Sequence, residues 1–228
     1  MNTSLLFRLT AVFLAYTVTS TLSATAAVVV TTSGGPTPFP VSATDLLQTD
    51  LGSAPVVTGI FNGFSSGGEI VLRDGISGPS DVGDYATTAI IGNNATVTYA
   101  FDVFSNPLGY EITQIDSFGA WDEARDRQDI SILFSTVGDP TAFTLLTNYS
   151  FDSPESNFSR VSVTPGAGDT FLMSNVHSIR FSFPEQETGA AGYRELDVQG
   201  LAVPEPSCLF LLSAVGFIAT FSRRRSDR

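Results

Sequence analysis

Between residues 56 and 201, short apolar runs are separated by clusters of turn residues. Apolar and polar positions often alternate within a run, so that Val97, Tyr99 and Phe101 share one side of an extended chain and Thr96 and Thr98 the other. Ile130, Ile132 and Phe134 form a second apolar face of this kind, and Ile179, Phe181 and Phe183 form a third. This period of two residues is typical of β-strands that bury one face.

The pattern predicts nine strands, at residues 56–61, 69–72, 95–101, 111–118, 129–135, 143–146, 160–164, 178–183 and 194–201, and residues 28–32 are compatible with another. No sustained helical periodicity occurs outside the two ends of the chain. Eighteen phenylalanines supply bulky side chains for a core between two sheets. We therefore predict an all-β fold, a two-sheet antiparallel β-sandwich of the jelly-roll type.

The C-terminal residues 203–228 combine three features in a fixed order. The first is the segment Val203-Pro204-Glu205-Pro206-Ser207, whose prolines exclude a regular helix. An uncharged run at 208–221 follows; as a helix it would extend about 21 Å, short of the roughly 30 Å of a bilayer's hydrocarbon core. The arginines at 223–225 then predict a cytoplasmic end for the chain.

These features together resemble the PEP-CTERM protein-sorting tail of Gram-negative bacteria. The resemblance implies export by the secretion machinery, recognition by an exosortase and cleavage near the Pro-Glu-Pro segment. The membrane would then hold the chain only transiently. The alternative is a plain C-terminal transmembrane helix that anchors the chain permanently.

The N-terminus has the features of a signal peptide. Arg8 precedes an apolar run at 9–22, and Ala24-Thr25-Ala26 is a cleavage signature. We place cleavage after Ala26. The expected organisation is a signal peptide at 1–26, a lead-in rich in threonine and proline at 27–55, a β-sandwich domain at 56–202 and the sorting tail at 203–228. We expect the lead-in to be mobile or to lie along an edge, and the domain to reach the cell surface or the extracellular medium.

The portion between the two processed ends is strongly acidic, with 6 arginines, 22 acidic residues and a formal charge near −16. This charge repels nucleic acid and anionic lipid and suits divalent cations, basic partners or neutral sugars. It is equally compatible with a role in solubility alone. Because Cys208 is the only cysteine and His177 the only histidine, the domain has no disulfide, no thiolate chemistry and no site with several histidine ligands.

Four segments inside the predicted sandwich together resemble the discoidin-type, galactose-binding-like jelly roll. They are Leu72-Arg73-Asp74-Gly75 and residues 117–121, 130–136 and 193–200. The resemblance implies a β-sandwich that binds glycans, lipids or proteins through loops at one end, with a structural calcium ion in many members. Where better-known members often carry a tryptophan after the Asp-Gly loop, this chain has Tyr85-Ala86-Thr87.

The loop that begins at Asp74 also carries Asp81 and Asp84, and its glycines free carbonyl groups to turn inward. Calcium binds six to eight oxygens of these kinds. In the resembled family the acid of the Asp-Gly loop and the first acid of the closing strand contribute to the ion, which here implies Asp74 and Glu195. Asp81 and Asp84 are further candidate ligands by spacing alone. The alternative is a loop of Asx turns without an ion.

Trp121 lies in a charged segment together with Asp122, Arg125 and Arg127. An exposed indole can stack on a sugar ring while charged neighbours bind its hydroxyl groups, so these four residues form a candidate glycan-binding group. The competing interpretation is that Trp121 fills one end of the sandwich and the charges form a solvated ion-pair cluster.

The segment Gly63-Phe64-Ser65-Ser66-Gly67 matches the G-x-S-x-G pattern of hydrolases, which has catalytic meaning at a strand-to-helix elbow. No helical pattern follows it, and we assign no catalytic residue. The sequence thus predicts a non-enzymatic surface or matrix protein that binds extracellular polysaccharide or another surface component. Two alternatives stay open: a secreted glycan or ester hydrolase on a jelly-roll scaffold, and a structural matrix protein without a ligand.

Overall fold

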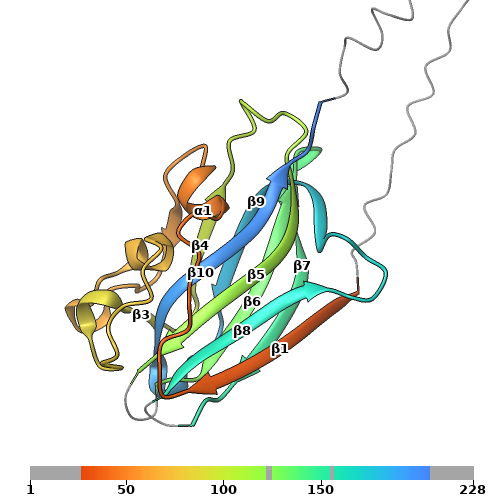
Figure 1. The fold of residues 1–228 in the computed structure, drawn as a ribbon. Helices are drawn as coiled ribbons and strands as arrows, with labels where there is room; N and C mark the ends of the chain where they lie inside the picture. The colour runs from red at the N-terminus through yellow and green to blue at the C-terminus, as the bar shows by residue number, and fades with distance from the viewer. Residues whose placement is uncertain (1–26, 122–124, 155–156, 206–228) are drawn as a thin grey trace, which may run out of the picture.

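The computed structural model describes residues 27–121, 125–154 and 157–205, and these form two antiparallel β-sheets packed face to face (Figure 1). The first sheet contains, in spatial order, β1 (Val28–Gly35), β8 (Phe158–Pro165), β5 (Tyr110–Ala120), β10 (Ala190–Ala202) and β3 (Ala89–Gly92). The second contains β7 (Asp139–Phe151), β6 (Gln128–Thr136), β9 (Met173–Phe183), β4 (Ala95–Ala100) and β2 (Val56–Thr58).

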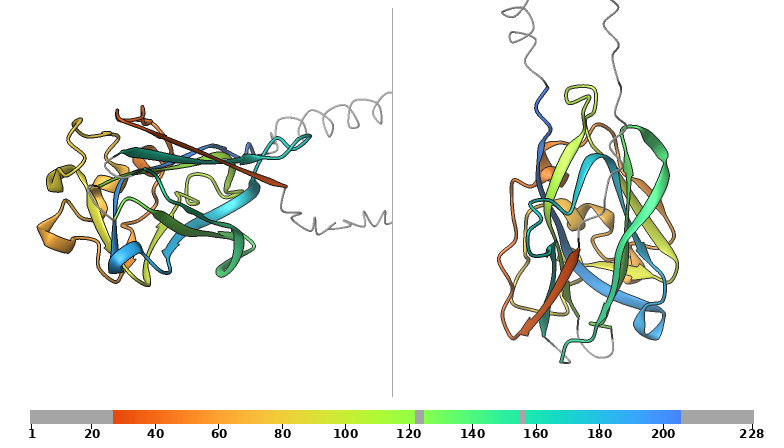
Figure 2. Two further views of the ribbon diagram at one scale, coloured as in Figure 1. Left: turned by 90° about the horizontal axis from the view of Figure 1, so that it is seen from below. Right: turned by 90° about the vertical axis from the view of Figure 1, so that its right-hand side faces the viewer.

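The two sheets are joined along one side, where the beginning of β5 pairs with β9 through Tyr110–Val176 and Ile112–Met173. Every pairing between strands of the sandwich is antiparallel. The all-β sandwich expected from the alternating pattern is therefore confirmed. Figure 2 shows the two layers from two further directions.

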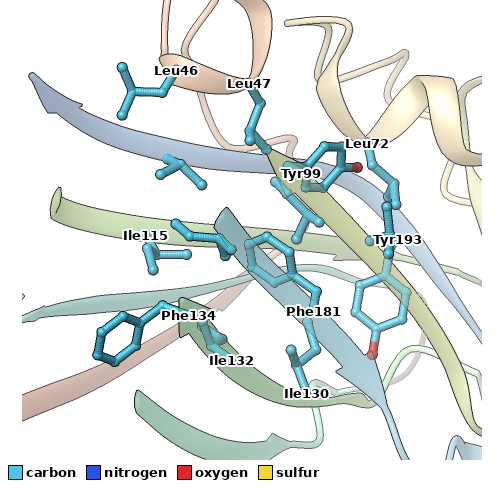
Figure 3. Close-up of a cluster of buried hydrophobic side chains, with 14 of the residues drawn as sticks. Leu46, Leu47, Leu72, Tyr99, Ile115, Ile130, Ile132, Phe134, Phe181 and Tyr193 are labelled. Carbon is cyan, nitrogen blue, oxygen red and sulfur yellow. The ribbon is translucent and has the colours of Figure 1, made fainter. Parts of the chain in front are cut away.

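The core lies between the sheets and contains the apolar faces that the alternation predicts (Figure 3). Val97, Tyr99 and Phe101 are buried. The apolar faces of β9, which pairs with β4, and of β6, which pairs with β9, extend this surface across the same sheet. The threonines between them, Thr96 and Thr98, are half-buried. Aromatic rings fill much of this volume, with Phe183 in edge contact with both Phe61 and Tyr193.

Three local expectations were wrong or incomplete. Residues 69–72, expected as a strand, lie in a 3₁₀ helix (η2, Glu69–Arg73), because the adjacent Val71 and Leu72 are both buried, which one face of a strand cannot achieve. Strand β3 was missed because it is buried on both faces and shows no alternation. Helix α1 (Leu46–Thr49) was missed because it is only one turn long.

The lead-in belongs to the sandwich. Its first strand, β1, pairs with β8 along the edge, as expected for residues 28–32. Farther along, Asp45 and Gln48 form a reciprocal capping box on α1, and Leu46 and Leu47 enter the core. Two short 3₁₀ helices, η1 (Gly63–Ser65) and η3 (Tyr85–Thr87), follow before β3, and η4 (Glu187–Gly189) precedes β10.

The expected signal helix at 1–26 and transmembrane-like helix after residue 206 lie outside the described residues. Within the described ranges, no helix has the length and apolar character needed to span a bilayer.

Candidate functional site

Three buried carboxylates, Asp45, Glu195 and Asp197, meet beside α1 and β10; we call them the carboxylate cluster. One oxygen from each lies within 4.8 Å of the others. Asp45 is the N-cap residue of α1. Glu195 and Asp197 are two positions apart on β10 and therefore project from the same face of the strand. All three side chains are almost fully buried.

Backbone and side-chain donors satisfy only part of the carboxylate cluster. Asp45 Oδ1 accepts hydrogen bonds from Leu47 N (2.8 Å) and Val198 N (3.2 Å), and Asp197 Oδ2 accepts one from Ser42 N (2.7 Å). The second oxygens, Asp45 Oδ2 and Asp197 Oδ1, are buried without a donor among the described residues. Buried carboxylate oxygens without donors in the protein favour a proton or a cation.

Glu195 connects the carboxylate cluster to two other segments. Its Oε1 accepts a hydrogen bond from Gln48 Nε2 (3.1 Å) in α1, and its Oε2 accepts one from Gly75 N (3.2 Å) in the Asp-Gly loop. Asp74 also shares a hydrogen bond with the Glu195 side chain. The lead-in, the Asp-Gly loop and β10 thus converge on one carboxylate.

The electrostatics of the carboxylate cluster favour its neutral form when no cation is present. Burial, then the neighbouring Asp197, Asp74 and Asp45 charges, raise the pKa of Glu195 to about 10. Burial and the Asp45 charge raise the pKa of Asp197 to about 7, and burial also raises the pKa of Asp45. Within the described part of the chain, no salt bridge from arginine reaches these three residues. A divalent cation would supply the charge that the protein does not.

Two of the four predicted calcium ligands, Asp74 and Glu195, are in contact; Asp74 is exposed and lies at the margin of the carboxylate cluster. The other two serve their own loop: Asp81 Oδ1 accepts from Gly83 N (3.0 Å), and Asp84 caps η3 through Ala86 N (3.2 Å). Asp45 and Asp197 were not among the predicted ligands. Each carried a signal, since Asp197 shares the strand face of Glu195, and Asp45 and Gln48 have the spacing of a capping box.

Arg194 holds the loop between Asp74 and β3 in place through hydrogen bonds from its guanidinium. It is the extra residue of a β-bulge, because Tyr193 pairs with Gly119 and Glu195 with the adjacent Phe118. Its guanidinium donates to four acceptors of the loop: Pro79 O (3.4 Å), Asp81 O (2.5 Å), Val82 O (3.2 Å) and Thr87 Oγ1 (2.9 Å). Gly78 is needed here, since a Cβ at that position would lie 2.2 Å from Arg194 Nη1.

Trp121, expected as an exposed stacking residue of the glycan-binding group, is instead 2% exposed. It follows β5 at the end of the sandwich, where Gly192 packs closely against its ring. The structure therefore corrects the exposed-indole expectation and agrees with the packing interpretation. Of its partners in that group, Asp122 lies outside the described residues and Arg127 is half-buried.

The ring of Trp121 instead supports an exposed pair of aromatic residues. Tyr85 packs edge-on against it with ring centroids 4.8 Å apart, and Phe64 lies 6.4 Å from Tyr85. The guanidinium of Arg125 lies 5.3 Å from the Phe64 ring centroid. Phe64 and Tyr85 are 62% and 45% exposed. We call Phe64, Tyr85 and Arg125 the aromatic surface; only Arg125 of these was predicted.

Phe64 is held in an unfavourable backbone conformation. Its φ of 53° and that of Ser65, 60°, are in the left-handed region, which a bulky side chain disfavours. The surrounding contacts hold the turn in place: Ser66 Oγ accepts from Ile90 N (3.1 Å), and Gly67 N donates to Tyr85 O (2.9 Å). Backbone strain at an exposed aromatic residue is typical of a ligand-binding position.

The G-x-S-x-G segment lies in and just after η1, with no strand-to-helix elbow. The serine of the pattern, Ser65, ends η1 with a φ of 60°, whereas His177 is hydrogen-bonded through Nδ1 to Ser178 Oγ (2.6 Å) beside the loop that follows β4. The described residues therefore do not assemble the hydrolase arrangement that this pattern would need.

No family model and no curated protein matches the chain. Its fold is similar to solved structures at 13% identity. The Clostridium perfringens module CpGH89CBM32-5, in complex with GalNAc-β-1,3-galactose, covers 68% of this chain and 99% of its own, with a TM-score of 0.47. The CBM32-1 and CBM32-2 domains of Clostridium perfringens ZmpB, in complex with GalNAc, cover 64% of this chain, which spans 33% of theirs (TM-score 0.43). The match to a pectin-binding carbohydrate-binding module covers 68% of this chain and 96% of that module, with a TM-score of 0.41. These likenesses are distant and concern the fold alone.

Proposed function

We propose that this protein is an exported surface protein whose β-sandwich binds a neutral extracellular polysaccharide through the aromatic surface. The observation that carries the proposal is the exposure of Phe64 and Tyr85 beside a guanidinium, with Phe64 in a strained turn. Aromatic faces stack on the apolar face of a sugar ring, and Arg125 offers donors to its hydroxyl groups. The formal charge near −16 favours neutral over acidic polysaccharides.

Calcium at the carboxylate cluster is the second part of the proposal. Asp45, Glu195 and Asp197 would hold the ion, with Asp74 beside them, and the donor set of hard oxygens fits calcium. The ion would neutralise the buried carboxylates and connect α1, β10 and the Asp-Gly loop. Its role is to stabilise the loop that carries Tyr85 and to take no part in a reaction.

Export and processing form the third part. The Val203-Pro204-Glu205-Pro206-Ser207 segment, the apolar run at 208–221 and the arginines at 223–225 support recognition by an exosortase. Val203, the first residue of this segment, donates to Gly109 O (2.9 Å). Pro204 and Glu205, the next two residues of the segment, are exposed.

The substitution Phe64→Asn separates binding from folding. Asparagine tolerates the left-handed region, so the variant should be as stable as the parent protein or more stable by up to about 1 kcal/mol in unfolding free energy. Its unfolding temperature should be equal to or slightly above that of the parent. It should bind polysaccharide roughly tenfold more weakly, the equivalent of about 1.4 kcal/mol, because the stacking ring is lost. The measurements are thermal unfolding and pull-down with insoluble neutral and uronate-containing polysaccharides.

The matched control is Ile60→Asn, at an exposed apolar residue outside the aromatic surface, which should leave binding unchanged. Equal binding by the Phe64→Asn variant and the parent would contradict the proposed surface. Absence of binding to every polysaccharide by the parent would favour the structural matrix protein without a ligand.

A further inference from the structure

A loop at residues 102–109, here the tail-side loop, projects from the end of the sandwich where the chain leaves β10 (Figures 1 and 2). It connects β4 to β5. Its last residue, Gly109, accepts the hydrogen bond from Val203 N, which ties the loop to the start of the tail. The loop and the departing chain are therefore neighbours.

Phe104, in the tail-side loop, is 96% exposed, the most exposed of the large hydrophobic side chains in the described ranges. The loop beneath it is ordered by hydrogen bonds: Asp102 Oδ1 accepts from Phe104 N (3.2 Å) and Ser105 N (3.1 Å), and Asn106 N donates to Asp102 O (3.1 Å). An aromatic ring is thus presented to solvent on a fixed turn, and little ordering remains to oppose its burial by a partner.

The position of the tail indicates what this partner is. The apolar run begins at Cys208, five residues after Val203, and this stretch can extend at most about 18 Å. When the apolar run lies in a bilayer, the tail-side loop must therefore lie close to the lipid headgroups. Aromatic side chains are favoured at this boundary between headgroups and acyl chains.

We propose that Phe104 inserts into the surface of the membrane while the tail is still anchored there, and so fixes the orientation of the sandwich. This inference rests on the proposed anchoring of the tail. Trp121, beneath the aromatic surface, follows the far end of β5, whose 11 residues place it about 35 Å from the tail-side loop. The aromatic surface would then point away from the membrane, toward extracellular polymer.

The charges around the tail-side loop select the kind of lipid. Asp102 belongs to the loop, Asp50 Oδ1 accepts a hydrogen bond from the Tyr110 hydroxyl (3.2 Å) at the loop's end, and Glu205 follows Val203 by two residues. Hydrogen bonds from Ser105 lower the pKa of Asp102, which keeps this carboxylate charged. An acidic border with a single aromatic tip suits a zwitterionic lipid surface and is repelled by anionic lipid.

The test uses the exported chain with its tail, reconstituted into phosphatidylcholine vesicles, and the substitution Phe104→Trp. The native Trp121 is buried, so the difference from the parent protein reports the new indole. We expect blue-shifted emission and quenching by lipids brominated near the headgroup. Added phosphatidylglycerol should weaken the quenching. The matched control, Phe64→Trp, at the exposed aromatic surface, should show neither effect.

Flotation of the vesicles distinguishes anchoring by the tail from insertion of Phe104. If the protein does not float with the vesicles, both the anchored tail and the insertion of Phe104 are overturned. If it floats but Phe104→Trp is quenched no more than Phe64→Trp, only the insertion is overturned. Quenching that requires a co-reconstituted exosortase also overturns it, and would assign the tail-side loop to contact with that enzyme.

Discussion

Without calcium, the folded protein should become less stable as the pH rises. The pKa of Asp197 is about 7 in the fold against 3.8 for the ordinary side chain, and that of Glu195 is about 10 against 4.5. Above about pH 4 the folded protein therefore keeps protons that the unfolded chain has lost. Each such proton lowers the free energy of unfolding by about 1.4 kcal/mol per pH unit. The loss should extend from about pH 4 to 7 for Asp197 and continue toward 10 for Glu195.

Calcium should remove this dependence, because the ion replaces the protons and binds better as the pH rises. The stabilisation by calcium, measured as the difference in unfolding free energy between calcium and EDTA, should therefore increase from acidic to alkaline pH. Urea unfolding across this pH range is the measurement. A stability in EDTA that does not change between about pH 4 and 7 would contradict the protonated carboxylate cluster. Identical curves in calcium and EDTA at every pH would exclude the ion.

The effect of the substitution Asp197→Asn on the free energy of unfolding should have opposite signs with and without calcium. In EDTA at neutral pH the variant should be more stable than the parent, because an amide needs no added proton and can donate to the unpaired Asp45 Oδ2. In calcium it should be less stable, because a carboxylate ligand is lost. Asp152→Asn, at an exposed acid, is the control and should behave like the parent in both buffers. A loss of equal size in calcium and EDTA would show that Asp197 acts without an ion.

Loss of the Arg194 guanidinium should be the most damaging single change in the loop region. Arg194→Ala removes the hydrogen bonds that the buried guanidinium donates to Pro79 O, Asp81 O and Val82 O, and it opens a cavity beside Phe158. We expect a loss of about 3 kcal/mol or more. Arg194→Lys should recover only part of this, because an ammonium cannot reach acceptors spread over several residues.

Arg180→Ala is the matched control, since Arg180 is half-buried, stacks on Phe143 and donates to Thr98 Oγ1. It should cost about 1 kcal/mol. Urea unfolding gives both values, and digestion with a protease of broad specificity should cut residues 76–87 faster in Arg194→Ala than in the parent. Equal costs for the two arginines, with no new cleavage, would show that Arg194 does not hold the loop.

The fold could be predicted further than the site. Alternation located most strands because one buried face produces a repeat of two residues in the sequence. The same argument could not detect β3, whose four residues are all buried, or assign η2, whose buried Val71 and Leu72 are adjacent. The structure brings Asp74 and Glu195 into contact and leaves Asp81 and Asp84 bonded within their own loop, because residues near one another along a loop need not be near in space. Calcium itself stays a prediction.

By itself, the sequence determined the all-β sandwich, the faces of β4, β6 and β9, and the acidic character of the domain, because periodicity and composition are local properties of the chain. Only the tertiary structure decided that Asp45 from the lead-in meets Glu195 and Asp197, that Trp121 is buried and that Phe64 and Tyr85 are exposed above it. These depend on strand register, on the bulge at Arg194 and on turns with positive φ, which bring together residues far apart in the chain.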